Sequence, residues 1–281
     1  MTSGDPTFAI AFGGGGARGL AHIHVIEAFD ELGIKPVAIA GSSIGAIMGA
    51  AMAAGMSGAE IRDYTLSVVG KPAEVMNRIW SLRPASIGAM LKGGGWVGQY
   101  NLERILKAFL PARIPADFSG LSIPLMVTAT DYYGREEVVT NSGDLYLAMA
   151  ASAALPAVFM PVMLNGRIMI DGGIYNPVPF DLLRGVADIV VGVDVVGAPE
   201  GDGITTPARI ESLFGASQLM MHSITTAKLK IEAPQIFLRP DVNGFRALEF
   251  LKANEILKKS EAVKDRVKAA IDAEFVFRMK R

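Results

Sequence analysis

The chain has 281 residues, of which 51% are hydrophobic and 20% are charged, a composition that excludes an intrinsically disordered protein. A net charge of −1 excludes a general attraction to nucleic acid or anionic lipid, and the absence of cysteine excludes disulfides, cysteine-bound zinc and thiol catalysis. The N-terminal segment lacks the pattern of a signal peptide, and no apolar run reaches the about 20 residues of a membrane-spanning helix. We therefore expect a cytoplasmic protein with no nucleic-acid partner, whose only membrane contact would be peripheral, at the inner membrane surface.

The first 55 residues predict a strand, a helix, a second strand and a second helix. Short apolar runs bounded by glycine and proline indicate strands at 8–12 and 37–40. Apolar residues at helical spacing indicate helices at 20–32 and 46–54. A unit of this length joins parallel strands through a right-handed crossover.

The rest of the chain continues this α/β pattern. Helices joined by loops are expected at 57–120, and residues 198–281 are expected to be mainly helical and packed on the same domain. Further strands are predicted at 124–130, 137–140, 167–170, 189–196 and 235–238, and further helices at 101–110, 144–154 and 209–230. No repeat or linker divides the chain, so we expect one α/β domain with its strands buried on both faces. The helix predicted at 209–230 would cover the site or form an interface.

An irregular, apolar and glycine-rich segment lies at 83–98. It is interpreted either as a loop packed on the core or as a flap that faces lipid. In the second case the lipid and headgroup contacts would come from Trp80, Arg83, Met90, Leu91, Lys92 and Trp96.

A glycine–serine turn is the first candidate site. The sequence Gly41-Ser42-Ser43-Ile44-Gly45 fits the G-x-S-x-G pattern and lies between a predicted strand and a predicted helix. Such a turn presents its central serine beside a helix N-terminus, which supplies partial positive charge and free N–H groups. The setting favours Ser43 as a nucleophile over the alternative, an ordinary turn at a helix N-cap.

A second glycine-rich turn lies at 13–19, between the first strand and the first helix. Successive glycines can aim backbone N–H groups into one concavity that suits an anion. The spacing of its glycines also fits a dinucleotide-binding fingerprint, but that site needs an acidic residue at the end of the second strand, where this chain has Ala40 and the serine turn. We therefore predict an oxyanion hole over a nucleotide-binding oxidoreductase or a turn that binds no ligand. The predicted donors are the N–H groups of Gly14, Gly15, Gly16 and Ile44.

Two residues are candidates for the base that takes the proton from Ser43. Asp171 ends an apolar strand and precedes two glycines that allow a close turn, although Asp-Gly is also common in hairpins. His222 completes the chain order serine, acid, histidine of an α/β-hydrolase triad, but here the serine follows the second strand, earlier than in that fold. The other histidines point to different faces of the first predicted helix and are interpreted as helix residues: His22 and His24.

The glycine loop, the serine turn and Asp171-Gly172-Gly173, in this order and spacing, resemble the patatin-like phospholipase family. Further similar segments are Thr130-Asp131, residues 150–156 with Phe159 and Pro161, and Asn176-Pro177-Val178-Pro179. The resemblance looks closest to the bacterial branch related to the neuropathy target esterase catalytic domain. It implies a three-layer α/β/α fold with a central, mostly parallel sheet and a catalytic domain at 7–197, whereas residues 198–281 match less clearly.

The resemblance also implies an activity, namely hydrolysis of acyl esters of phospholipids or lysophospholipids by a Ser43–Asp171 dyad without a metal or other cofactor. Support for the dyad is expected from Arg18, Gly19, Gly41, Gly45, Gly172 and Gly173. Arg18 would stabilise the glycine loop, attract a phosphate or form a structural salt bridge. A non-catalytic or regulatory member of the same fold would keep these residues, so this alternative stays open, as does the oligomeric state.

Overall fold

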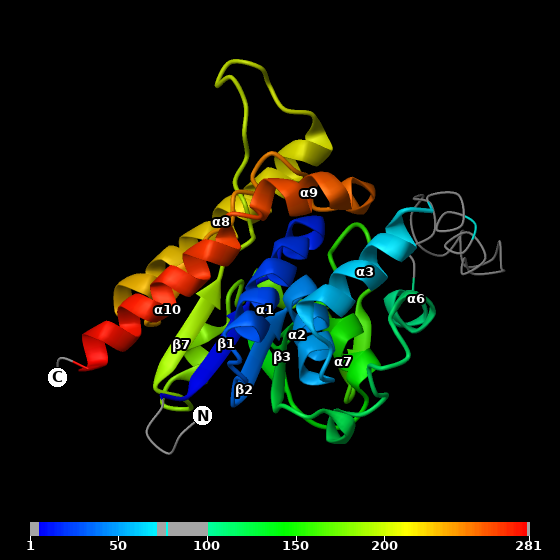
Figure 1. Ribbon diagram of the computed structural model, residues 1–281. Helices are drawn as coiled ribbons and strands as arrows, with labels where there is room; N and C mark the ends of the chain where they lie inside the picture. The colour runs from blue at the N-terminus through cyan, green and yellow to red at the C-terminus, as the bar shows by residue number, and fades with distance from the viewer. Residues whose placement is uncertain (1–5, 72–76, 78–100, 280–281) are drawn as a thin grey trace.

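A mixed β-sheet forms the centre of the computed structural model, which describes residues 6–71, 77 and 101–279 (Figure 1). Within this part of the chain the sheet has eight strands in the order β5-β6-β3-β2-β1-β7-β8, and β4 also pairs with β3. The pairs β1-β2, β1-β7, β2-β3 and β7-β8 are parallel, whereas β3-β4, β3-β6 and β5-β6 are antiparallel. The strands are β1 (Phe8–Phe12), β2 (Ala38–Ser42), β3 (Leu125–Asp131), β4 (Glu136–Thr140), β5 (Val162–Leu164), β6 (Arg167–Asp171), β7 (Ile189–Val193) and β8 (Ile236–Leu238).

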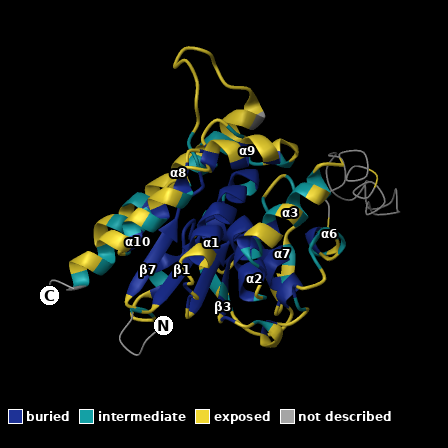
Figure 2. Ribbon diagram, viewed as in Figure 1, coloured by how far each residue is buried: buried dark blue, intermediate teal, exposed yellow. Residues whose placement is uncertain are grey.

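Helices cover both faces of the sheet, which confirms the predicted three-layer α/β fold. Among the described residues, the helices with defined bounds are α1 (His22–Glu31), α2 (Ile44–Ala53), α3 (Gly58–Val69), α6 (Leu102–Phe109), α7 (Leu145–Ser152), α8 (Arg209–Ile231), α9 (Ala253–Ser260) and α10 (Val263–Met279). In β1, Phe8 and Phe12 join the core formed with α1 and α2 on one face, because successive strand residues alternate between faces. Ala9 and Ala11 face the other way and pack under the 3-10 helix η4 (Phe180–Leu183). The central strands β1, β2 and β7 and most of α1 are buried, whereas α8 is mostly exposed or half-buried (Figure 2).

Two elements of the structure differ from the sequence-based expectation, because glycines or a short strand weaken the hydrophobic pattern from which helices and strands are predicted. The first helix begins as the 3-10 helix η1 (Gly16–Ala21) and becomes α-helical only at His22. β5 has three residues, too few for an alternating pattern, and the sequence did not predict it. The apolar segment at 83–98 and the lipid-facing residues suggested for it lie outside the described residues.

The pairing along β3 determines where the candidate site forms. β2 runs parallel to β3 and ends with Ser42 opposite Thr128, whereas β6 runs antiparallel and ends with Asp171 opposite Ala129. β4 pairs with residues 127–131 and occupies the other edge of β3, so β2 and β6 share one edge. Their carboxyl ends therefore meet at two adjacent residues of β3.

Candidate active site

Ser43 occupies a strained turn between β2 and α2. Its backbone has φ 55° and ψ −125°, a conformation that non-glycine residues adopt rarely and that costs about 1–3 kcal/mol. The flanking glycines make the turn possible, since a Cβ at Gly41 would lie 2.5 Å from Ala46 Cα and one at Gly45 would overlap the carbonyl of Phe12. This is the geometry of a nucleophile elbow, with the serine directly before a helix N-terminus.

Asp171 lies at the end of β6 and contacts the Ser43 hydroxyl directly. Ser43 Oγ donates a hydrogen bond to Asp171 Oδ2 at 2.6 Å, and the Gly173 N–H donates to Oδ1 at 2.8 Å. Burial raises the pKa of Asp171 from 3.8 to about 6, although the bonds from Ser43 and Gly173 oppose this shift. The carboxylate is therefore ionised at neutral pH but has a higher proton affinity than an exposed aspartate.

The first residue after Asp171 also requires glycine, and the second leaves little space for a side chain. A Cβ at Gly172 would overlap the carbonyl of Thr128, and one at Gly173 would lie 3.0 Å from Asp171 Oδ1 and 3.2 Å from Met221 Sδ of α8. The Thr130 hydroxyl donates to the Asp171 carbonyl at 2.9 Å. Small residues and β3 thus fix the backbone that carries the carboxylate.

The glycine loop lies beside Ser43, because a Cβ at Gly14 would lie 3.2 Å from Ser43 Cβ. Gly15 and Gly16 are half-buried, and among the described residues none accepts a hydrogen bond from their N–H groups or from that of Ile44. Gly14 differs, since its N–H donates to the Pro177 carbonyl at 2.9 Å. Because this bond already uses the Gly14 N–H, the prediction that the Gly14 N–H is an oxyanion-hole donor is wrong.

Arg18 is a buried support of this loop. Its Nε donates to the Gly15 carbonyl at 3.2 Å, and its guanidinium packs against Gly197. Burial lowers the Arg18 pKa to about 10, an effect that nearby Asp194 opposes. Gly19 is required close by, since a Cβ there would overlap the side chain of Ile44. These contacts agree with the loop-stabilising role considered for Arg18, and its attraction for phosphate stays a prediction.

None of the three histidines is hydrogen-bonded to Ser43 or Asp171 in the described part of the chain. Burial lowers the pKa of His22 to about 4, and its neutral ring bonds the Gly13 carbonyl through Nε2 at 2.9 Å. His24 is buried between Glu27 and the Leu257 carbonyl. His222 is exposed on α8, while the Ser43 hydroxyl is bonded to Asp171. The geometry thus favours Asp171 over His222 as the partner of Ser43.

Further residues support the site although no sequence motif assigns them a role. Ser152, at the end of α7, accepts the Ser43 N–H on its Oγ at 2.8 Å. On α8, Lys228 Nζ bonds Asn176 Oδ1, Asp181 Oδ1 and, at 3.0 Å, the Val178 carbonyl. Both Ser152 and Asn176 lie in segments noted for their family resemblance, which was the available signal, whereas Lys228 lies in no such segment.

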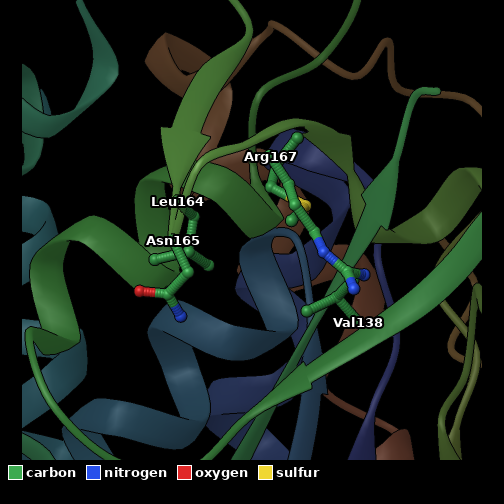
Figure 3. Close-up of a pocket in the computed structure, with 5 residues that line it drawn as sticks. Val138, Leu164, Asn165 and Arg167 are labelled. Atoms are coloured by element: carbon green, nitrogen blue, oxygen red, sulfur yellow. The ribbon is translucent and has the colours of Figure 1, made fainter. Parts of the chain in front are cut away.

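A surface pocket of about 450 Å³ lies apart from Ser43 and Asp171. It is formed between β4 and the β5–β6 hairpin, and Val138, Leu164, Asn165, Arg167 and Met169 line it (Figure 3). In the described part of the chain, no group of three or more acidic, histidine or cysteine side chains is arranged to hold a metal. Among the helices of that part, none is long and apolar enough to cross a membrane.

This fold and site define an α/β protein in which an elbow serine is hydrogen-bonded to a buried carboxylate. The model of the patatin-like phospholipase family matches residues 10–184, and the chain belongs to this family, as its motifs predicted. The boundary predicted at residue 197 stays a prediction.

Curated relatives include proteins of the neuropathy target esterase (NTE) group. The chain is 37% identical over 208 residues to an uncharacterized NTE family protein of Mycobacterium tuberculosis, an alignment that covers 74% of this chain and 52% of that protein. It is 25% identical over 272 residues to lysophospholipase nte1 of Aspergillus fumigatus, covering 88% of this chain and 17% of that protein. The chain thus spans about half the length, or less, of these relatives. The solved structure of VipD from Legionella pneumophila is 13% identical, with a TM-score of 0.49 over 94% of this chain and 66% of that one.

Proposed function

We propose that the chain is a serine acyl hydrolase in which Ser43 is the nucleophile and Asp171 is its base. The observation that carries this proposal is the 2.6 Å hydrogen bond from Ser43 Oγ to Asp171 Oδ2. The bond joins a hydroxyl held in a nucleophile elbow to a buried carboxylate whose pKa is about 6. A base with a pKa close to the working pH combines ionisation with useful proton affinity.

In the acylation step, Ser43 Oγ attacks the carbonyl carbon of an ester while its proton passes to Asp171. The carbonyl oxygen becomes an oxyanion, and the N–H groups of Gly15, Gly16 and Ile44 are its proposed donors. When the intermediate collapses, the bond from carbon to the alcohol oxygen breaks and the alcohol takes the proton from Asp171. The product is acyl-Ser43 and a free alcohol.

In the deacylation step, water attacks the acyl carbon while Asp171 accepts one of its protons. The bond between the acyl carbon and Ser43 Oγ then breaks, and Oγ recovers the proton from Asp171. A carboxylic acid leaves and the dyad is restored. This cycle balances with water as the only co-reactant.

The proposed substrates are phospholipids or lysophospholipids, and the proposed site of action is a membrane surface at which the protein binds peripherally. Support comes from membership of the patatin-like phospholipase family and from the similarity to a protein named lysophospholipase. These observations support the class of substrate.

The test compares the wild-type protein with S43A, D171N and H222A on p-nitrophenyl butyrate and on a lipid panel read by mass spectrometry. S43A and D171N are expected to lose at least about 10³-fold in kcat, whereas H222A should keep the wild-type rate. A fluorophosphonate probe should label wild-type Ser43. Loss of activity in both D171N and H222A would replace the dyad by a triad in which Asp171 orients His222, whereas full activity of D171N would exclude Asp171 from either role. A folded wild-type protein that neither reacts with the probe nor hydrolyses any ester would be the non-catalytic member of the fold.

A further inference from the structure

The end of α7 contacts the backbones of both Ser43 and Asp171. Ser152 Oγ accepts the Ser43 N–H at 2.8 Å, and the Ala154 carbonyl accepts the Asp171 N–H at 3.1 Å. Ser43 and Ser152 are separated by 109 residues in sequence. A three-residue segment at 152–154 therefore binds both partners of the dyad through their main chains.

The Ser43 N–H needs an acceptor that the neighbouring secondary structure does not supply. β2 ends at Ser42 and α2 begins at Ile44, so this N–H lies between a sheet ladder and a helix. A buried N–H without an acceptor is unfavourable, and Ser152 is fully buried, which limits the access of water to this position. The Ser152 hydroxyl is thus the group that satisfies the amide of a strained residue.

The position of Ser152 is itself fixed. Asp144 caps the N-terminus of α7, because its carboxylate accepts the Leu147 N–H at 2.9 Å, and the α7 residues Met149, Ala150 and Ala151 are fully buried. A rigid helix end can hold an elbow that is strained at φ 55°. Without the hydroxyl, the backbone of Ser43 would be free to relax and move Oγ relative to Asp171.

We infer that Ser152 is a positioning residue of the dyad. It holds the Ser43 backbone so that Oγ meets Asp171 Oδ2, and it engages the Ser43 N–H, which leaves the oxyanion to Gly15, Gly16 and Ile44. This inference rests on the proposed function for its kinetic consequences, while the hydrogen bond itself can be tested without activity.

The experiment uses S152A and S152C, with S260A as the matched control. Both Ser152 variants remove a strong acceptor. The slightly larger cysteine leaves no cavity, so S152C is the second variant if S152A fails to fold. Ser260 is equally buried, but its hydroxyl bonds the Ile256 carbonyl of its own helix at 2.7 Å. Kinetics on p-nitrophenyl butyrate, the rate of fluorophosphonate labelling and the melting temperature are measured for each protein.

We expect kcat and the labelling rate of the Ser152 variants to fall about 100-fold, with KM nearly unchanged, as for a displacement of about 1 Å at a reacting atom. S260A should keep the wild-type kcat whatever its melting temperature. A wild-type kcat in a folded Ser152 variant would overturn the inference, as would losses that follow melting temperature equally in all three variants.

Hydrogen exchange at the Ser43 amide separates this inference from the proposed function. The exchange rate, read by NMR on nitrogen-labelled protein, should rise at least about 10-fold in S152A and stay unchanged in S260A. If the wild-type protein hydrolyses no ester, the proposed function fails and this result still decides whether Ser152 holds Ser43. Equal exchange in wild type and S152A would reject that role even in an active enzyme.

Discussion

Asp171 Oδ2 lies 2.6 Å from Ser43 Oγ, although 128 residues separate them along the chain. The contact arises because the carboxyl ends of β2 and β6 meet on one edge of β3. It combines a strained serine with a buried carboxylate, and each of these features has a measurable consequence.

The rate of ester hydrolysis is expected to rise with pH through about 6 and then level off. Asp171 must be ionised to accept the Ser43 proton, and burial raises its pKa from 3.8 to about 6, so protonation below this value removes the base. Values of kcat/KM measured from about pH 4.5 to about pH 8.5 should fit one ionisation near 6. A rate that stays constant down to the lowest pH, in protein shown to be folded there, would contradict Asp171 as the base.

D171N is expected to be more stable than the wild-type protein at neutral pH. The folded state raises the Asp171 pKa from 3.8 to about 6, so it binds more protons than the unfolded state between these values, and the free energy of unfolding falls as pH rises through this window. Above pH 6 the raised Asp171 pKa lowers the free energy of unfolding by about 3 kcal/mol. Urea unfolding should show D171N stabilised by about 1–3 kcal/mol at pH 7.5, with the gain absent near pH 4. An equal or lower stability of D171N at pH 7.5 would show that the ionised carboxylate costs little.

Much of the site can be predicted from the sequence because its parts are local. The turn that carries Ser43 and the pair of glycines after Asp171 are each recognisable within a few residues. The dyad contact itself depends on two strands that share one edge of β3, which is a long-range pairing without a local signal. For the same reason the sequence did not show that Pro177 occupies the Gly14 N–H or that Ser152 accepts the Ser43 N–H.

G15A is expected to lower kcat by about 100-fold, with a smaller effect on KM. A Cβ at Gly15 would overlap the Val195 carbonyl, so the loop must shift and carry the N–H groups of Gly15 and Gly16 with it. Those groups are the proposed oxyanion donors, which act mainly in the transition state. Steady-state kinetics on p-nitrophenyl butyrate measure the effect, and G201A is the control because a Cβ there meets nothing within 4 Å. A folded G15A protein with the wild-type kcat would exclude Gly15 from the oxyanion hole.

K228M is expected to weaken both stability and activity, because Lys228 joins α8 to the chain that follows Asp171. Its ammonium contacts Asn176, Val178 and Asp181, and burial lowers its pKa although Asp181 opposes this shift. Methionine would fill the same volume but leave the Asp181 carboxylate and the Asn176 side-chain oxygen without their cation. Because this pair is only partly buried, we expect a loss of about 1–3 kcal/mol in the free energy of unfolding.

The kinetic effect of K228M should follow from the same contacts. Asn176 lies five residues after Asp171, and Gly173 packs against Met221 of α8, so loosening α8 frees the turn that donates to Asp171 Oδ1. K107M is the matched control, since Lys107 is exposed and pairs with Glu103 within its own helix, where such pairs contribute little. Urea unfolding and kcat on p-nitrophenyl butyrate, measured for both variants, test whether α8 holds the turn that follows Asp171. If K228M unfolds at the wild-type urea concentration and keeps the wild-type kcat, α8 does not hold the Asp171 turn, and its contacts there are incidental to the site.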